Sequence, residues 1–157
     1  MSRHWRLDET DIRVRGRWHD LYRAVDQAGQ TIDVLSTTYR DEPAAKRFLT
    51  RAIRRHGVPE TVTIDGSEAN AAAIRSNNST HGTTIVIRQV RYLTNVVEQD
   101  HHAVKRVVWP TLGFKAFETA QHTLAGVELM HMWHKGQWTG GAEQGLTAAE
   151  QCYALAV

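Results

Sequence analysis

The stretch WRLDETDIRVRGRWHDLYRAVDQAGQTIDVLS, residues 5–36, decides the fold that we expect for this chain. Polar and apolar residues alternate along it, and Gly16 and Gly29 interrupt the alternation as turn formers. Connections this short join neighbouring antiparallel strands. The stretch therefore predicts a three-stranded meander, with strands at 5–15, 18–26 and 30–36.

Helices and further strands are expected after the meander. Asp41 offers an N-cap and Pro43 lies in a first turn, after which apolar residues recur at helical spacing until Gly57. The later elements that we expect are a strand at 61–64, a brief helix at 68–75 before the turn-rich segment 76–79, a strand at 85–90, and helices at 95–109 and 115–135. This order predicts an α/β fold, a mixed five-stranded sheet flanked by helices on both faces, as in ribonuclease H-like domains.

Length and composition bound the class of protein. A chain of 157 residues with 41% hydrophobic and 23% charged residues is typical of one globular domain. The single cysteine, Cys152, excludes an internal disulfide and favours a reducing compartment. No apolar run reaches the roughly 18 residues of a membrane span, so we expect a cytoplasmic protein without a membrane partner. The absence of a glycine-rich phosphate loop argues against a nucleotide cofactor.

Basic residues are clustered, although the net charge is only +2. Arginines gather within 13–17, 47–55 and 88–91, and Lys105 and Arg106 follow. Such clusters are compatible with a DNA partner. They are equally compatible with the solvated faces of hairpins and helices, so no single cluster decides between the two.

Three acidic residues lie at positions that suggest a functional role for their carboxylates. Asp8 is in the first strand, on the same side as the apolar residues Ile12 and Val14. Asp65 ends the strand 61–64, and ligand sites in α/β proteins gather at the carboxyl ends of strands. Glu98 is on the helix expected at 95–109 and faces away from its apolar valines.

Each of these acids also has an ordinary explanation. Asp8 could form a salt bridge at a sheet edge, Asp65 could cap the following helix, and Glu98 could form a solvent-facing stripe with Lys105. The combination of the three is more specific. Carboxylates from separate elements can hold two Mg²⁺ or Mn²⁺ ions roughly 4 Å apart, the arrangement used for phosphoryl transfer at DNA phosphodiesters.

Several longer motifs narrow the choice: WRLDET (5–10), YRAVD (22–26), TIDGSEAN (63–70), YLTNVVEQDH (92–101), LGFKAF (112–117) and MHMWHKGQ (130–137). Together with residues 146–156, they resemble the DDE transposases of insertion sequence family six over nearly the whole chain. The resemblance implies a ribonuclease H-like catalytic domain at 1–136, with 137–157 as its C-terminal tail. It also implies a metal-binding triad of Asp8, Asp65 and Glu98.

The resemblance has further implications for mechanism and partners. The implied reaction is divalent-metal-dependent cleavage at the element ends, followed by attack of the exposed 3′-hydroxyl on target DNA. Lys105 is implied as a catalytic basic residue, and the implied partners are transposon ends, target DNA and further copies of the chain assembled on DNA at the nucleoid. The implied DNA contacts come from Asn95, His101, Lys105 and Arg106.

The sequence also departs from the family pattern. The family usually carries a helix-turn-helix region before the first motif, which begins here at residue 5, so we expect weak recognition of terminal repeats. His102 and Trp109 stand where arginines are usual, which removes positive charge from the expected DNA side. Two alternatives stay open: a catalytically silent fragment that pairs with an intact transposase, and a nuclease that cuts without joining. A zinc pair of His131 and His134 is weakly supported, because zinc sites gather three or four ligands.

Overall fold

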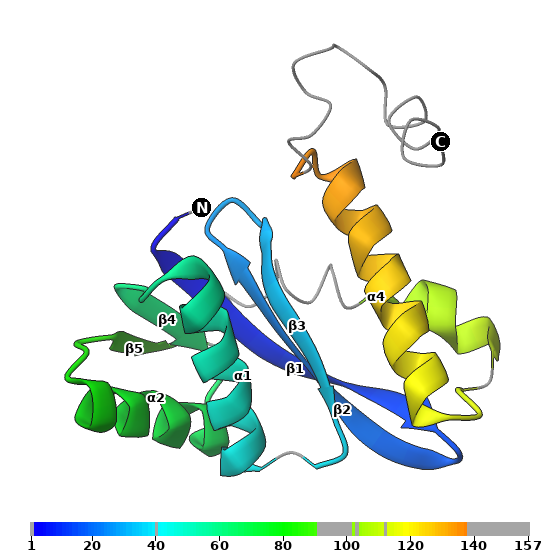
Figure 1. The fold of residues 1–157 in the computed structure, drawn as a ribbon, viewed down its shortest axis with the longest axis horizontal. Helices are drawn as coiled ribbons and strands as arrows, with labels where there is room; N and C mark the ends of the chain where they lie inside the picture. The colour runs from blue at the N-terminus through cyan, green and yellow to red at the C-terminus, as the bar shows by residue number, and fades with distance from the viewer. Residues whose placement is uncertain (1, 40, 91–101, 103, 112, 138–157) are drawn as a thin grey trace.

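The computed structural model describes residues 2–39, 41–90, 102, 104–111 and 113–137 (Figure 1). One five-stranded sheet runs through it, in the order β3-β2-β1-β4-β5. The first three strands are antiparallel neighbours, whereas β4 is parallel to β1 and β5 is parallel to β4. The strands are β1 (His4–Val14), β2 (Arg17–Asp26), β3 (Thr31–Thr37), β4 (Thr61–Ile64) and β5 (Val86–Gln89). The predicted meander and mixed sheet are confirmed.

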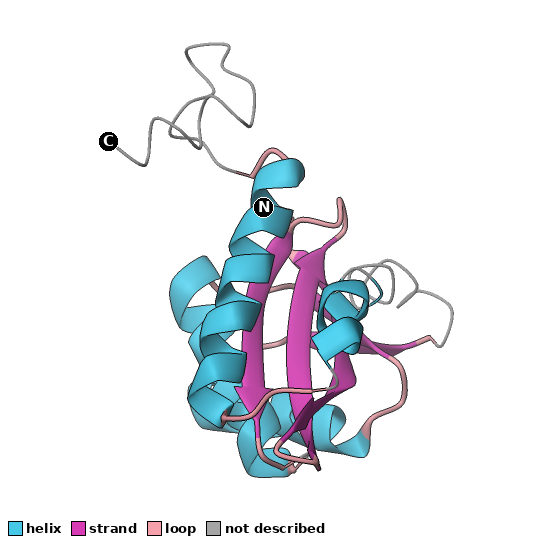
Figure 2. Cartoon of the chain, turned by 90° about the vertical axis from the view of Figure 1, so that its right-hand side faces the viewer, coloured by secondary structure: helices cyan, strands magenta, loops and turns pink. Residues whose placement is uncertain are grey.

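Helices lie on both sides of this sheet, as predicted (Figures 1 and 2). One side carries α1 (Glu42–His56) and α2 (Glu68–His81), and the other carries α4 (Phe117–His134). Residue 102 and residues 104–108 are also helical and continue into the short 3-10 helix η1 (Trp109–Thr111). The start of the helix expected at 95–109 lies outside the described residues.

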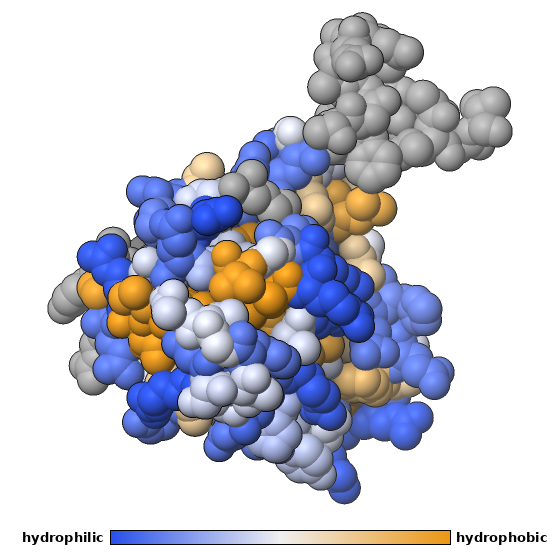
Figure 3. Space-filling model, turned by 60° about the vertical axis from the view of Figure 1, so that its left-hand side comes forward, coloured by the Kyte–Doolittle hydropathy of each residue, from blue (hydrophilic) through white to orange (hydrophobic). Residues whose placement is uncertain are grey.

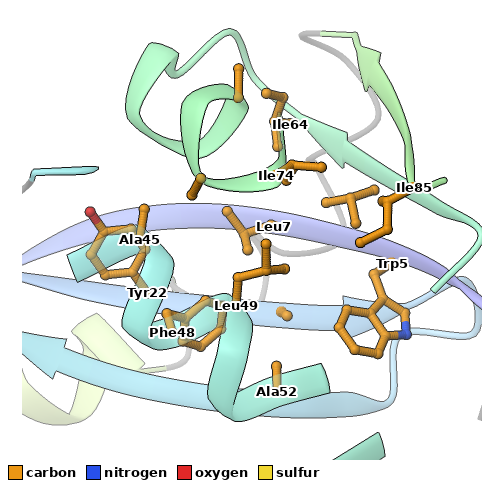
Figure 4. Packing of buried hydrophobic residues seen from close by; sticks show 14 of the residues in the cluster. Trp5, Leu7, Tyr22, Ala45, Phe48, Leu49, Ala52, Ile64, Ile74 and Ile85 are labelled. Carbon is orange, nitrogen blue, oxygen red and sulfur yellow. The ribbon is translucent and has the colours of Figure 1, made fainter. Parts of the chain in front are cut away.

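The two faces of the sheet have separate hydrophobic cores, and β1 contributes to both because its side chains alternate. The first core packs α1 and α2 against the sheet, with Trp5 and Leu7 from β1 (Figure 4). Phe48 of α1 stacks on Tyr22 of β2, with ring centroids 5.7 Å apart. The second core contains Ile12, Val14, Leu21, Val104, Val108, Phe114, Ala120 and Leu124.

Helix α1 has the boundaries that its sequence signals predict. The Asp41 carboxylate accepts a hydrogen bond from the Ala44 backbone N–H at 2.8 Å, which satisfies one of the free donors of the first turn. At the other end, the Gly57 N–H donates to Ile53 O at 2.8 Å, and Gly57 has a φ of 84°. This positive φ costs glycine little, so the chain leaves the helix there.

Helix α2 is longer than predicted. The segment 76–79, which we expected to be turn-rich, is helical, and the helix continues to His81. Asn78 explains the difference, because its side chain accepts from the Ile85 N–H and donates to Ile85 O at 3.1 and 2.9 Å. Asn77 similarly donates to the Thr83 hydroxyl at 3.0 Å. These bonds satisfy the asparagine side chains without competing for the helix backbone.

The segment after η1 returns to the edge of β1, beyond the end of β4. Phe114 N–H donates to Arg13 O at 2.8 Å, and Phe114 forms an isolated parallel bridge with Val14. Gly113 makes this approach possible: its φ is 102°, and a Cβ there would lie 2.9 Å from Arg13 O. The close packing ties residues 113 and 114 to β1.

Most of the surface on the side of α1, α2 and β5 is hydrophilic, with small apolar patches (Figure 3). Val58, which precedes β4, and Val86, the first residue of β5, are exposed large apolar residues. Within the described ranges, no helix is both long enough and apolar enough to cross a bilayer.

Candidate metal centre

Asp8 and Asp65 come together at the point where β4 ends beside β1. The two strands are parallel, with Arg6 paired to Thr63, so two residues further on Asp8 lies level with Asp65. Gly66 follows with a φ of 111°, which lets the chain turn away at once. Two of the three acids that the sequence singled out therefore share one site.

A third carboxylate, Glu9, joins them, although the sequence analysis did not select it. One ligand atom from each of Asp8, Glu9 and Asp65 lies within 4.8 Å of the other two. Glu9 is on the face of β1 that carries Trp5 and Leu7. A charged residue on the same face as these apolar residues was the sequence signal that could have identified it. Its proximity to Asp65 depends on the β1–β4 register, which the sequence did not provide.

Helix α2 holds Glu9 and Asp65 in place through its first turn. Ser67, the N-cap, donates its hydroxyl to Glu9 Oε1 at 3.0 Å, and the buried amide of Asn70 donates to the same oxygen at 2.9 Å. The Ser67 backbone N–H donates to Asp65 Oδ1 at 3.2 Å. Carboxylates beside a helix N-terminus are stabilised by its partial positive charge.

Asp8 differs from Asp65 in its surroundings. The Asp8 residue is 7% exposed, whereas Asp65 is exposed to solvent. Directly opposite Asp8 on β2 is Arg23, which is fully buried and forms an ion pair with Glu128 of α4. Arg23 therefore connects β2, the strand paired with the one that carries Asp8, to α4 on the side of the second core.

The remaining predicted site residues fall into two groups. Lys105 and Arg106 are exposed on the helical segment 104–108, whose Val104 and Val108 are buried in the second core. Val107 of the same segment is 53% exposed. Glu98, Asn95 and His101 lie outside the described residues.

The donor set fits a hard divalent cation. Three carboxylates offer oxygen ligands of the kind that Mg²⁺ and Mn²⁺ prefer, and they come from two strands held by a common hydrogen-bonded register. Of the residues that the structure describes, these are the only three His, Cys, Asp or Glu side chains close enough together to share an ion. His131 and His134 acquire no third ligand there, which leaves the zinc alternative unsupported.

Comparison with known families identifies the family of this chain. Residues 2–137 match the IS240-type family described as a DDE domain, which covers the sheet, the helices on both faces and the acid cluster. The chain belongs to the IS240/IS6-family DDE transposase domains. This agrees with the resemblance found in the sequence.

Bacterial transposases are among the relatives of this DDE domain. It is 33% identical over 138 residues to a Staphylococcus aureus transposase for the insertion sequence-like element IS431mec, and equally so to the S. aureus transposase of IS257 in transposon Tn4003. Each match covers 83% of this chain. The chain spans 58% of the length of these transposases.

Solved structures with a similar fold include retroviral integrase cores. The catalytic core domain of HTLV-2 integrase, solved in complex with magnesium, has a TM-score of 0.60 at 16% identity, over 83% of this chain and 82% of that one. The core domain of BIV integrase has a TM-score of 0.53 at 19% identity, over 68% of each chain. The DDE domain therefore has the ribonuclease H-like fold that the element order predicted.

Proposed function

We propose that this DDE domain is the catalytic core of a transposase that cleaves DNA at element ends and joins the exposed 3′-hydroxyl to target DNA. The observation that carries the proposal is the convergence of Asp8 and Asp65 from two parallel strands. Glu9 lies beside them, and three neighbouring carboxylates repel one another unless a cation is present. The likeness to transposases at 33% identity supports the same reaction class.

In this proposal, Asp8, Asp65 and Glu98 hold two Mg²⁺ or Mn²⁺ ions. When bound, these ions activate the attacking water or hydroxyl and stabilise the leaving oxygen. Strand β1 fixes the Asp8 carboxylate and the Ser67 N–H orients that of Asp65, so the ligands need little rearrangement on binding. Glu9 acts as a further ligand or orients Asp65 through their shared partner Ser67.

The basic residues after the acid cluster bind the DNA backbone in this proposal. Lys105 and Arg106 are exposed on a helical segment whose other face is fixed in the second core, so their side chains project from a rigid base. Lys105 acts as the catalytic basic residue at the reacting end, and Asn95 and His101 add contacts from the preceding segment. We further propose that several copies of the chain assemble on paired DNA ends.

We also propose that the catalytic domain ends at about residue 136, with 137–157 as its tail. The last turn of α4 is tied to the β2–β3 turn, because Lys135 Nζ donates to Gly29 O at 2.6 Å. Gln137 follows, and its side-chain amide accepts from Thr31 N–H at 2.8 Å and donates to Thr31 O at 3.1 Å. These bonds anchor the end of α4 to the edge strand β3.

A strand-transfer assay tests the reaction. The chain is incubated with pre-cleaved element ends, a target plasmid and Mn²⁺, beside Asp65→Asn and the matched variant Asp41→Asn. Asp41 lies outside the acid cluster, and asparagine replaces aspartate well at an N-cap. We expect joined products from the wild type and Asp41→Asn, and none from Asp65→Asn.

The other outcomes of this assay separate the alternatives. Products that are nicked but never joined would indicate a nuclease. The absence of product from every sample would indicate a catalytically silent fragment. Joined products from Asp65→Asn would contradict the assignment of Asp65 as a catalytic metal ligand.

Thermal unfolding gives a readout that does not depend on activity. A ligand that binds only the folded state raises the melting temperature. We therefore expect Mn²⁺ to stabilise the wild type and Asp41→Asn, and to stabilise Asp65→Asn much less. Equal responses in all three proteins would contradict a metal site at Asp65.

A further inference from the structure

A groove lies beside the edge of β1, between the β1–β2 hairpin and the 104–113 segment. Its volume is about 630 Å³, within the range of about 300–1,000 Å³ that is usual for ligand sites. The groove begins at Asp11, three residues beyond Asp8 on the same strand, a separation of about 10 Å. It is therefore a neighbour of the acid cluster and shares none of its residues.

Two exposed tryptophans line this groove. Trp18, from β2, is 64% exposed, and Trp109, from η1, is 79% exposed. Tryptophan is usually well buried, so two such rings along one groove are unusual. The apolar lining residues Ile12, Val104 and Val108 belong to the second core. The rings therefore extend from a rigid, packed base.

Cations accompany the aromatic rings. The guanidinium carbon of Arg13 lies 6.0 Å from the centroid of the Trp18 ring, and Lys105 lines the groove beside Trp109. Asp11 is the acidic residue in the lining. The adjoining surface adds more positive charge, because four further basic residues of the hairpin and the returning segment are exposed: Arg15, Arg17, Arg106 and Lys115.

We propose that this groove binds an unpaired stretch of DNA, with bases stacked on Trp18 and Trp109 and phosphates held by Arg13 and Lys105. Exposed aromatic rings within a basic groove are the combination that recognises single strands, since every base has a face that can stack. Bases inside a duplex are already stacked and cannot reach the rings. The predominance of basic residues favours a polyanion over an apolar protein partner.

This inference rests on the proposed function, because it identifies the form of DNA that the domain holds next to its acids. An unpaired strand in the groove would run along β1 toward Asp8. The arginine usual in the family is replaced by Trp109, so a phosphate contact would be exchanged for a stacking contact. Binding at this position is thus expected to tolerate any base sequence.

The test is binding of a fluorescent oligo-dT of about 12 nucleotides, a length within the usual range for single-strand sites. Anisotropy is measured with EDTA present, so metal binding and catalysis do not contribute. We expect Trp18→Ala and Trp109→Ala each to weaken binding about tenfold, and the corresponding phenylalanine variants to retain most of the affinity. Tyr39→Ala is the matched control, since Tyr39 is 71% exposed and lies outside the groove.

Salt dependence tests the cationic part of the groove. Arg13→Gln is expected to reduce the slope of log affinity against log salt by about 0.7, the value for one phosphate contact on a single strand. Thermal melting of each variant shows whether a loss of binding reflects unfolding.

Wild-type affinity in both tryptophan-to-alanine variants would overturn the inference. Self-association of the chain that both variants abolish, with oligonucleotide binding unchanged, would also overturn it and assign the groove to a second copy. The strand-transfer assay separates the two proposals. Oligonucleotide binding without joined products would contradict the proposed function alone, and joined products with tryptophan-independent binding would contradict the groove alone.

Discussion

The two cores of this domain stabilise the same sheet in different ways. The first core, under α1 and α2, is a continuous cluster of apolar residues. On the opposite face, α4 contributes Ala120 and Leu124 to a second apolar cluster and also places Glu128 against the fully buried Arg23. An apolar cluster tolerates small changes of shape, whereas a buried ion pair depends on both partners. The first core therefore supplies a robust frame for α2 and the acid cluster, whereas the second combines apolar packing of α4 with a buried ion pair between α4 and β2.

Truncating the centre of the first core is expected to have the largest effect. Phe48 is 1% exposed and stacks on Tyr22, so Phe48→Ala should lower the free energy of unfolding by about 3–5 kcal/mol. Urea denaturation followed by circular dichroism measures this. Val86→Ala, at a position 57% exposed, is the control and should change the stability by less than about 0.5 kcal/mol. A loss below about 1 kcal/mol for Phe48→Ala would mean that the first core is not the main frame.

Removing one charge of the buried pair is the next test. Glu128→Gln removes the negative charge that α4 places against the buried Arg23 guanidinium and should cost about 3 kcal/mol. The double variant Arg23→Met with Glu128→Leu removes both charges and should recover most of that loss. The same denaturation experiment compares them. If the double variant were the less stable, the pair would contribute net stability and the contrast between the cores would weaken.

Gly113 tests how the second core is joined to β1. In Gly113→Ala, the new Cβ would lie 2.9 Å from Arg13 O at a backbone φ of 102°, so we expect a loss of about 1–3 kcal/mol. Gly126→Ala is a matched control, because a Cβ there meets nothing within 4 Å and alanine favours the helix. Thermal melting of both variants gives the comparison. Equal melting temperatures would show that the 113–114 bridge can shift without cost.

Two helix caps provide the smallest and most specific comparison. Asp41→Ala and Ser67→Ala each remove an N-cap and should each cost about 1 kcal/mol. Only Ser67 also donates to Glu9, so only Ser67→Ala should reduce the stabilisation by Mn²⁺. Differential scanning fluorimetry with and without Mn²⁺ measures both effects. A matching loss of the metal response in Asp41→Ala would argue that the response reflects general stability.

Much of this architecture could be predicted from local signals. Strands β1 to β4 and helix α1 lie within one or two residues of the predicted ranges, because alternation, glycine turns and the Asp41 cap act over a few residues. Helix α2 was predicted too short, since Asn77 and Asn78 find partners at Thr83 and Ile85 that only the folded chain provides.

The candidate site also contains residues that the sequence could predict and residues that it could not. Asp8 and Asp65 could be selected from their positions in and after strands, and the structure brings them together. Glu9 could not be selected from the sequence, because its place in the site depends on the register between β1 and β4 and on the hydrogen bonds from Ser67 and Asn70. Glu98 stays a prediction.

By itself, the sequence determined the kinds of elements, their order and the family, because these depend on short patterns and on runs of matching residues. Only the tertiary structure decided which distant side chains meet: Glu9 with Asn70, Arg23 with Glu128, and the two tryptophans along one groove. These contacts between distant side chains follow from strand register and from the packing of helices on the sheet. Both depend on contacts between residues far apart in the chain, so no local pattern encodes them.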